Sequence, residues 1–533
     1  MRCGRQTVCT STKSNFAWSY VDSFLVTPKN FTKREGVRVN IGITVRDSTR
    51  QLSVGKAFVI QGARVFDGTG QPGYLADVAV RDDRIVAVGA NLPVDADVQR
   101  IDAKGLSLAP GFIDAHTHDD RAVMATPDMT MKVSQGVTTV IGGNCGVSLA
   151  PLAGKQPPPP LNLLGDQSEF RFATMAEYFD AVNDTAPALN IAMLTGHSTL
   201  RVAEMSDLNR PATAQEIDRM GLLLDEAMAA GAIGFSTGLA YPTAQHAPTE
   251  EVIELSRRAA SAGGLYATHM RDEENKLLEA VDETVRIGKE SESKVVISHH
   301  KACGKQNWGK TRESLAMIDA ANAAGDTVDF DVYPYVASST VLLKHFVARA
   351  ERVMITWSES FPEMAGKDLD TISADWGLPQ DDTIDKLQPA GAIYFQMDEG
   401  DLRRVLSHPG AMVGSDGLPH DRRPHPRLWG TFPRVLGHYS RDEGLFPLET
   451  AIHKMTGLTA RVFGLEGRGV IAPDAYADLV LFNADTVIDR ADFDHPTETS
   501  AGIERVFVSG QEVWRDGAGT GARPGSVIRR ANR

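Results

Sequence analysis

Histidine, cysteine and aspartate residues follow several short apolar runs that have the composition of β-strands. His116 and His118 follow the run LAPGFIDA, and because side chains alternate along a strand, the two imidazoles point the same way. A single H-x-H pair is a weak signal of metal binding. Further residues of metal-ligand type end other candidate strands, namely Cys145, His269, His299 and Asp416. Together these residues predict a metal centre at the strand ends.

The chemical types of these donors select the metal. Imidazole nitrogens and a thiolate are borderline-soft ligands that suit Zn²⁺, whereas Mg²⁺ and Ca²⁺ sites are built mainly from oxygen atoms. We therefore expect zinc. His299 and His300 are adjacent in KVVISHH, so only one of them can face the site. His299 is the predicted ligand, with His300 as the alternative.

Asp416, in the segment AMVGSDG, is the candidate general base. Its carboxylate can accept a proton from water whose pKa zinc lowers to about 7, and can return that proton to a departing amine. The predicted reaction is metal-assisted amide hydrolysis. A structural Asp-Gly turn is the alternative interpretation of this residue.

The elements that must position these residues alternate between strand and helix, which predicts an α/β fold with a (β/α)₈ TIM barrel. Barrel enzymes place their chemistry at the C-terminal ends of the strands, where the candidate ligands lie. Two helices are predicted over residues 213–231 and 249–264, each beginning near a threonine cap and ending at glycine. The eight candidate strands are GLSLAPGFIDAHTH, GVTTVIGGN, NIAMLTGHS, GAIGFSTG, GLYATHM, KVVISHH, TVDFDVYPY and AMVGSDG.

The remaining segments divide the chain around this barrel. Short β-rich runs at both ends predict a β-sandwich formed by residues 56–108 and 466–533, with the barrel over 109–465. An insertion at about 334–391 separates the seventh and eighth barrel strands, and such insertions often shape the pocket. The proline-rich stretch at 155–164 is expected to be a loop after the second strand.

The first 55 residues differ from the rest of the chain. They are rich in Arg, Lys, Ser and Thr, and they lack the apolar core of a secretory signal. We interpret residues 1–55 as a disordered N-terminal extension or the product of a misplaced start of translation. No catalytic residue is assigned to this segment.

Composition limits the classes of partner. The net charge is −14 with scattered basic residues, which favours a small-molecule substrate over nucleic acid. No apolar run approaches the roughly 20 residues of a membrane-spanning helix. Four cysteines are too few for a disulfide framework and fit a cytoplasmic location. The oligomeric state stays open.

Long blocks of the sequence, from about residue 57 to the C-terminus, resemble the D-aminoacylase family of the amidohydrolase superfamily. These blocks include GFIDAHTHDD, SQGVTTVIGGNCGVSLAPLA, YATHMRDE, VVISHHK and GSDGLPHDRRPHPRLWGTFPRVLGHYSR. The resemblance implies deacylation of N-acyl-D-amino acids. It implies one zinc held tightly by Cys145, His269 and His299, and a second, weaker position formed by His116, His118 and Asp416.

The same resemblance assigns substrate contacts. Lys301, Tyr333 and Arg427 are expected to hold the α-carboxylate of the substrate, with Ser339 and Tyr241 as further contacts. Tyr394 and Met397 are expected to line the pocket for the amino-acid side chain. Because these two residues are large and adaptable, they favour a hydrophobic D-amino acid.

Three alternatives remain at the level of sequence. The stretch VLLKHFVARAERV departs from the family, and its Lys344 or Arg349 could meet an acidic side chain, as in a deacylase of N-acyl-D-glutamate or N-acyl-D-aspartate. A cyclic-amide hydrolase resembling dihydropyrimidinase would be expected to have a carboxylated lysine where this chain has Cys145. A catalytically silent barrel used for binding would be expected to have lost Asp416 or two of the histidines, and none is lost.

Overall fold

The computed structural model describes residues 57–531, which belong to one compact unit. The predicted extension over residues 1–55 lies outside the described residues, as do Cys3 and Cys9. No helix in the described part of the chain is both long enough and apolar enough to cross a membrane.

Eight parallel strands form a nearly closed barrel, and they are the eight that the sequence predicts. The seam between the first and last strands is bridged from Ala115 N to Val413 O over 3.1 Å and from Asp416 N to His116 O over 2.8 Å. Closure therefore brings the His116 and Asp416 backbones together. The strands, in their order around the barrel, are β6 (Phe112–Asp114), β7 (Val137–Gly142), β10 (Asn190–Gly196), β11 (Gly234–Gly238), β12 (Leu265–His269), β13 (Val295–Ile297), β14 (Val328–Val332) and β18 (Ala411–Val413).

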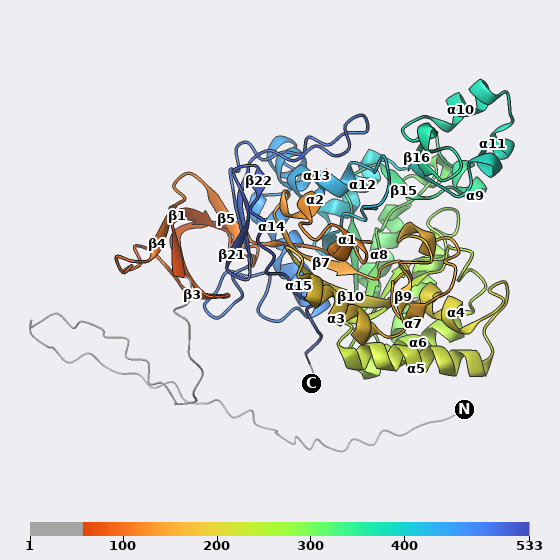
Figure 1. The fold of residues 1–533 in the computed structure, drawn as a ribbon, viewed down its shortest axis with the longest axis horizontal. Coiled ribbons are helices and arrows are strands. Elements are labelled where there is room, and N and C mark those ends of the chain that lie inside the picture. The colour runs from red at the N-terminus through yellow and green to blue at the C-terminus, as the bar shows by residue number, and fades with distance from the viewer. Residues whose placement is uncertain (1–56, 532–533) are drawn as a thin grey trace, which may run out of the picture. The chain divides into compact units, whose positions relative to one another are not determined.

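Helices connect these strands on the outside of the barrel (Figure 1). Helix α5 confirms its predicted ends, because Thr213 and Glu216 form a capping box and Gly231 closes the helix at φ 112°. The predicted threonine cap of α6 is wrong, since Thr249 is already helical and its hydroxyl donates to Glu283. The longer connecting helices are α3 (Met175–Thr185), α4 (His197–Glu204), α5 (Ala214–Ala230), α6 (Thr249–Ser261), α7 (Leu277–Ser291), α8 (Thr311–Ala323), α12 (Glu399–Ser407), α13 (Arg427–Arg434) and α14 (Leu448–Met455).

Shorter elements complete the barrel region. After β7 the proline-rich loop contains a single 3₁₀ turn, flanked by a two-stranded ladder. Past α13 the chain continues in a π-helix before reaching α14. These elements are α1 (Ala122–Ala125), α2 (Thr130–Val133), β8 (Leu152–Ala153), η1 (Leu161–Leu163), β9 (Arg171–Phe172), η2 (Lys305–Asn307), η4 (Val435–Asp442) and α15 (Gly457–Phe463).

Strands from the two ends of the described chain share one nine-stranded sheet. The sheet curls, so that the rings of Phe58 and Phe507 stack at 5.0 Å and Ile85 N donates to Ala475 O. Apolar residues from both segments thus bury a common core. Its strands are β1 (Ala57–Val65), β2 (Tyr74–Arg81), β3 (Arg84–Gly89), β4 (Gln99–Asp102), β5 (Ser107–Pro110), β19 (Leu479–Phe482), β20 (Ile503–Val508), β21 (Gln511–Arg515) and β22 (Ala518–Gly519).

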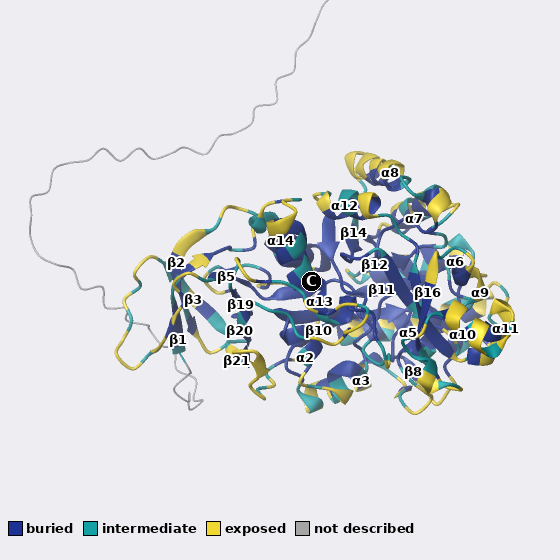
Figure 2. Ribbon diagram, turned by 90° about the horizontal axis from the view of Figure 1, so that it is seen from above, coloured by how far each residue is buried: buried dark blue, intermediate teal, exposed yellow. Residues whose placement is uncertain are grey.

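The insertion between β14 and β18 forms a small three-stranded sheet with its own helices. Strand β17 lies in the middle of this sheet, so the insertion runs through Phe395 and does not end near residue 391 as the sequence suggested. The outer faces of α10 and α11 are exposed (Figure 2). The elements are β15 (Ala337–Val341), α9 (Lys344–Val347), β16 (Arg352–Ser358), η3 (Pro362–Met364), α10 (Leu369–Trp376), α11 (Gln380–Leu387) and β17 (Ala390–Phe395).

Candidate active site

The predicted metal ligands meet at the C-terminal end of the barrel. Cys145 Sγ lies 3.2 Å from His116 Nε2 and 3.3 Å from His299 Nε2. Three overlapping groups of donors have their ligand atoms within 4.8 Å of one another, and every member is buried. The groups are His116, His118 and Cys145; Cys145, His269 and His299; and His116, His299 and Asp416.

Three of these residues have unusual backbone conformations. Cys145, His299 and Asp416 have φ angles of 53°, 38° and 49°, in the left-handed region that non-glycine residues rarely adopt. Each lies just beyond the end of its strand, where the left-handed turn redirects the side chain toward the barrel axis. Such strain persists where the surrounding structure enforces it, as happens at functional sites.

Neighbouring groups of opposite charge in the cluster stabilise one another's ionised forms. Burial alone would lower the pKa of His116, but the neighbouring Cys145 raises it well above its usual value. Burial would raise the pKa of the Cys145 thiol, yet the His116 imidazole lowers it well below normal. Burial also opposes ionisation of Asp416, but the Arg427 guanidinium holds its pKa well below its usual range. The site therefore favours the thiolate and carboxylate forms that bind a cation.

The donor set fits zinc. Ligand atoms at about 2.0–2.3 Å from a tetrahedral zinc lie roughly 3.3–3.8 Å apart, close to the separations around Cys145. Among the described residues, the buried Nδ1 atoms of His118 and His269 have no hydrogen-bond partner. His300 has turned away, because its Nε2 lies 2.8 Å from Ser314 Oγ. The geometry thus places His299 in the cluster and His300 outside it.

Two acidic residues beside the cluster were missed by the sequence analysis. Glu273 Oε1 lies 3.0 Å from His299 Nδ1, and Asp331 Oδ2 lies 3.3 Å from His116 Nδ1. Carboxylates in this position orient an imidazole ligand and increase its basicity. The sequence carried a signal for Asp331, since it shares strand parity with Tyr333 and must point the same way. Glu273 lies in a loop, where no periodicity marks it.

We expect Glu273→Gln to weaken zinc binding about 10–100-fold, the usual effect of removing an outer carboxylate partner. The amide would lose the charge that orients His299 and balances Lys301, whose Nζ is 2.7 Å from Glu273 Oε1. Competition with a chelator measures the affinity. Glu274→Gln is the matched control, because Glu274 pairs with Arg349. Equal zinc affinity in both variants would contradict this role.

Asp416 connects the donor cluster to Arg427. Its Oδ1 lies 3.5 Å from His116 Nε2 and 3.3 Å from His118 Nε2, while Oδ2 lies 2.8 Å from Arg427 Nη1. Arg427 is fully buried and also donates from Nη2 to the Ser339 carbonyl. The carboxylate is therefore held between the metal donors and a fixed cation.

The three residues expected to hold a carboxylate lie together. The Tyr333 ring lies between two cations, with the Arg427 guanidinium carbon 4.6 Å and the Lys301 Nζ 5.8 Å from its centroid. Lys301 Nζ also lies 2.8 Å from His299 Nδ1. Two positive groups thus lie next to the donor cluster, and each is already partnered by an acidic residue.

A narrow cavity opens onto Lys301, Tyr333 and Asp416, while Arg427 lies behind Asp416 and outside the lining. Ser339 and Tyr241 line it, as expected. The Tyr241 hydroxyl lies 3.0 Å from Thr340 Oγ1, and the Tyr241 ring packs against His269 with centroids 5.0 Å apart. The other apolar walls are Leu163, Phe346 and Leu418.

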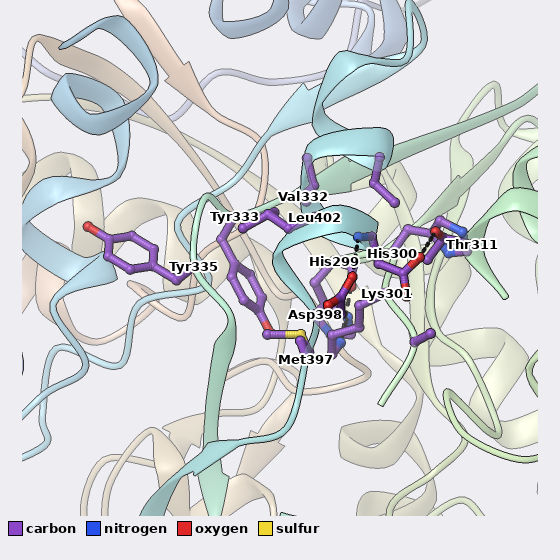
Figure 3. A pocket seen from close by; sticks show the side chains of 13 residues that line it. His299, His300, Lys301, Thr311, Val332, Tyr333, Tyr335, Met397, Asp398 and Leu402 are labelled. Atoms are coloured by element: carbon purple, nitrogen blue, oxygen red, sulfur yellow. Dashed lines mark hydrogen bonds between the residues drawn. The ribbon is translucent and has the colours of Figure 1, made fainter. Parts of the chain in front are cut away.

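The expected roles of Tyr394 and Met397 as walls of this cavity need correction. Tyr394 is fully buried in the insertion, donating to Val341 O and packing behind Phe346. Met397 lines a second, smaller space that shares Tyr333 with the catalytic cavity, and its sulfur lies 3.9 Å from the Tyr333 hydroxyl (Figure 3). Tyr394 and Met397 therefore contact Phe346 and Tyr333, which line the catalytic cavity.

The two cations of the divergent stretch lie in different surroundings. Lys344 is exposed and pairs with Asp385 over 2.7 Å. Arg349 lines the cavity, stacks over the Phe346 ring at 4.3 Å and pairs with Glu274. Of the two, only Arg349 can meet a bound substrate there.

Comparisons with known proteins agree with this geometry. The model of the amidohydrolase family matches residues 99–358 and 377–514. A D-aminoacylase of Alcaligenes xylosoxydans xylosoxydans is 55% identical over 472 residues, which cover 89% of this chain and 97% of the relative. A crystal structure of D-aminoacylase superposes with a TM-score of 0.87 at 55% identity, covering 89% of this chain and 99% of the other. An N-acyl-D-glutamate deacylase from Bordetella bronchiseptica, complexed with zinc and a phosphonate inhibitor, superposes with a TM-score of 0.83 at 46% identity and the same coverages.

Proposed function

The chain belongs to the amidohydrolase family, and on that premise we propose that it is a zinc-dependent deacylase of N-acyl-D-amino acids. Water is added across the linear amide bond, which yields a carboxylate and a free D-amino acid. The observation on which the proposal rests is the position of Asp416, whose carboxylate contacts both the His118 imidazole and the buried Arg427 guanidinium.

In this proposal Cys145, His269 and His299 hold one zinc tightly, and His116, His118 and Asp416 form a second, weaker position. Zinc bound there supplies Lewis-acid polarisation of the amide carbonyl and lowers the pKa of water to about 7.

Asp416 performs the proton transfers. Its carboxylate accepts a proton from the attacking water and delivers it to the amide nitrogen as the carbon–nitrogen bond breaks. Although burial opposes its ionisation, the pairing with Arg427 keeps Asp416 ionised and oriented before substrate arrives. The proton therefore travels from the water to the leaving amine through one fixed group.

Lys301, Tyr333 and Arg427 bind the α-carboxylate of the substrate. The planar guanidinium offers two parallel donors, and the ammonium adds a second positive charge. With the carboxylate held there and the carbonyl held at the metal donors, two of the substituents around Cα are fixed. The third, the side chain, can reach the cavity walls in one enantiomer only.

The cavity walls favour a hydrophobic D-side chain. Leu163, Phe346 and Leu418 are apolar, and the charge of Arg349 is already balanced by Glu274. An acidic side chain is the second candidate, since among the described residues the buried Nε of Arg349 has no hydrogen-bond partner. The test is deacylation of N-acetyl-D-methionine by zinc-loaded protein, beside its L-enantiomer and N-acetyl-D-glutamate. Absence of turnover on all three would refute the proposed function.

Arg349→Met separates the two side-chain classes. If the side chain of the substrate is hydrophobic, kcat/KM for N-acetyl-D-methionine should change less than about threefold, because no charged contact is lost. Any activity on N-acetyl-D-glutamate should fall by about 10–100-fold, the range for a lost charge-assisted hydrogen bond. Lys344→Met is the control and should change neither rate. A large loss on methionine with glutamate unaffected would contradict this assignment of Arg349.

A further inference from the structure

An open groove lies beside the catalytic cavity, and nothing in the proposed mechanism uses it. One wall is the proline-rich loop, with Pro157–Pro159 and Leu163. The opposite wall comes from the insertion and includes Trp357 of β16. His420 and Asp421, on the loop that follows Asp416, also line it. We call this feature the outer groove.

The outer groove adjoins the catalytic cavity. Leu163 lines both spaces and is 7% exposed, so the outer groove and the catalytic cavity adjoin at this residue. Leu418 lines the cavity two residues before His420, and Arg121 lines the groove three residues after His118. The outer groove therefore begins beside the metal donors carried by the first and last barrel strands.

The barrel topology determines which part of a substrate points toward it. Lys301 and Tyr333 follow β13 and β14, the sixth and seventh strands, whereas the proline-rich loop follows β7, the second strand. In a closed ring of eight strands, the second strand lies across the axis from the sixth and seventh. An N-acyl amino acid carries its acyl group and its carboxylate on opposite sides of the amide. When Lys301 and Tyr333 hold the carboxylate, the acyl group is directed toward the outer groove.

The proline-rich wall and Trp357 offer apolar faces to a flat or extended group, and polar residues such as Asn162, Glu359 and Asp421 complete the lining of the groove. Prolines and an indole ring present rigid apolar faces that lose little side-chain entropy on binding. A Cβ built on Gly391 would lie 2.3 Å from Trp357 Nε1, so this glycine allows the indole its position. The charge of Arg121 is balanced by Glu169 at 3.0 Å.

We propose that the outer groove is the subsite for acyl groups larger than acetyl, with Trp357 as its main contact. The occupant is an aromatic acyl group such as phenylacetyl, whose ring stacks on the indole and the prolines while its carbonyl reaches the metal donors. This inference rests on the proposed deacylase function. It makes the acyl group, as well as the D-amino acid, a determinant of specificity.

The test compares N-acetyl-D-methionine and N-phenylacetyl-D-methionine as substrates of the zinc-loaded full chain and of Trp357→Ala. We expect the variant to lose about tenfold in kcat/KM on the phenylacetyl substrate, mainly through KM, because a stacked aromatic pair is lost. On the acetyl substrate it should stay within about twofold, since acetyl does not reach the indole. Trp376→Ala is the matched control: Trp376 packs on Phe361 in the same insertion, away from the groove.

A second measurement does not depend on turnover. Phenylacetate should inhibit the wild type more strongly than acetate does, and Trp357→Ala should reduce this difference. If Trp357→Ala lowers the rates on both substrates equally, or changes neither rate, the outer groove is not the acyl subsite, although the deacylase function stands. If the wild type hydrolyses neither substrate, the proposed function itself fails, and the subsite with it.

Discussion

Asp416→Asn should retain the tightly bound zinc and lose about 10²–10⁴-fold in kcat, the range expected when a positioned general base is removed. The amide has nearly the same shape as the carboxylate but cannot accept the proton of the attacking water. Zinc should remain because the proposed tight ligands, Cys145, His269 and His299, are unchanged. Metal analysis and steady-state kinetics on the same preparation measure both quantities.

The comparison for this variant is Asp319→Asn, which removes a carboxylate from the outer surface of α8, where it pairs with His408. That variant should keep both zinc and rate. KM of Asp416→Asn will also change, because Arg427 loses its partner. The decisive number is therefore kcat, and a variant with full turnover would refute the proton-transfer role of Asp416.

Cys145→Ala should lose zinc and, with it, detectable deacylation. Cys145 belongs to two of the three donor groups and supplies the only thiolate among them. Its loss should weaken zinc binding by more than about 100-fold, beyond the effect of removing an outer partner. Zinc per chain after dialysis, and affinity by competition with a chelator, report the change without relying on activity.

Cys303→Ala is the matched control for this prediction. Cys303 is also a buried free cysteine, but burial raises the pKa of its thiol, whereas that of Cys145 is lowered. Cys303→Ala should therefore keep its zinc and its activity. If Cys145→Ala retained a full equivalent of zinc, the assignment of the tight site would be wrong. Thermal unfolding of the apo proteins distinguishes loss of metal from loss of fold.

Most of the barrel could be predicted from the sequence. All eight strands lie where largely apolar runs predict them, because a parallel strand covered on both faces buries most of its side chains. The residues that follow these runs were correctly expected to lie at one rim. The cap of α6 was mispredicted, since Thr249 bonds to Glu283 of the next helix, a contact that no local pattern reveals.

The insertion could not be interpreted in this way. Its strands pair antiparallel, and which face of β17 meets the core depends on how the small sheet packs. Tyr394 therefore lies in the core of the insertion and not in the catalytic cavity. The same packing buries Arg349 in the cavity wall and leaves Lys344 at the surface, although the two lie only five positions apart.

The sequence by itself determined the barrel and predicted a zinc centre with its candidate donors, because strand periodicity and ligand chemistry are properties of short segments. The tertiary structure alone decided which charges face those donors. Glu273 reaches the site from a loop, Asp331 from β14 and Arg427 from the start of α13. Their distances to His299, His116 and Asp416 follow from closure of the barrel. Such long-range contacts depend on the packing of the whole chain, and this is why Glu273 carried no local signal.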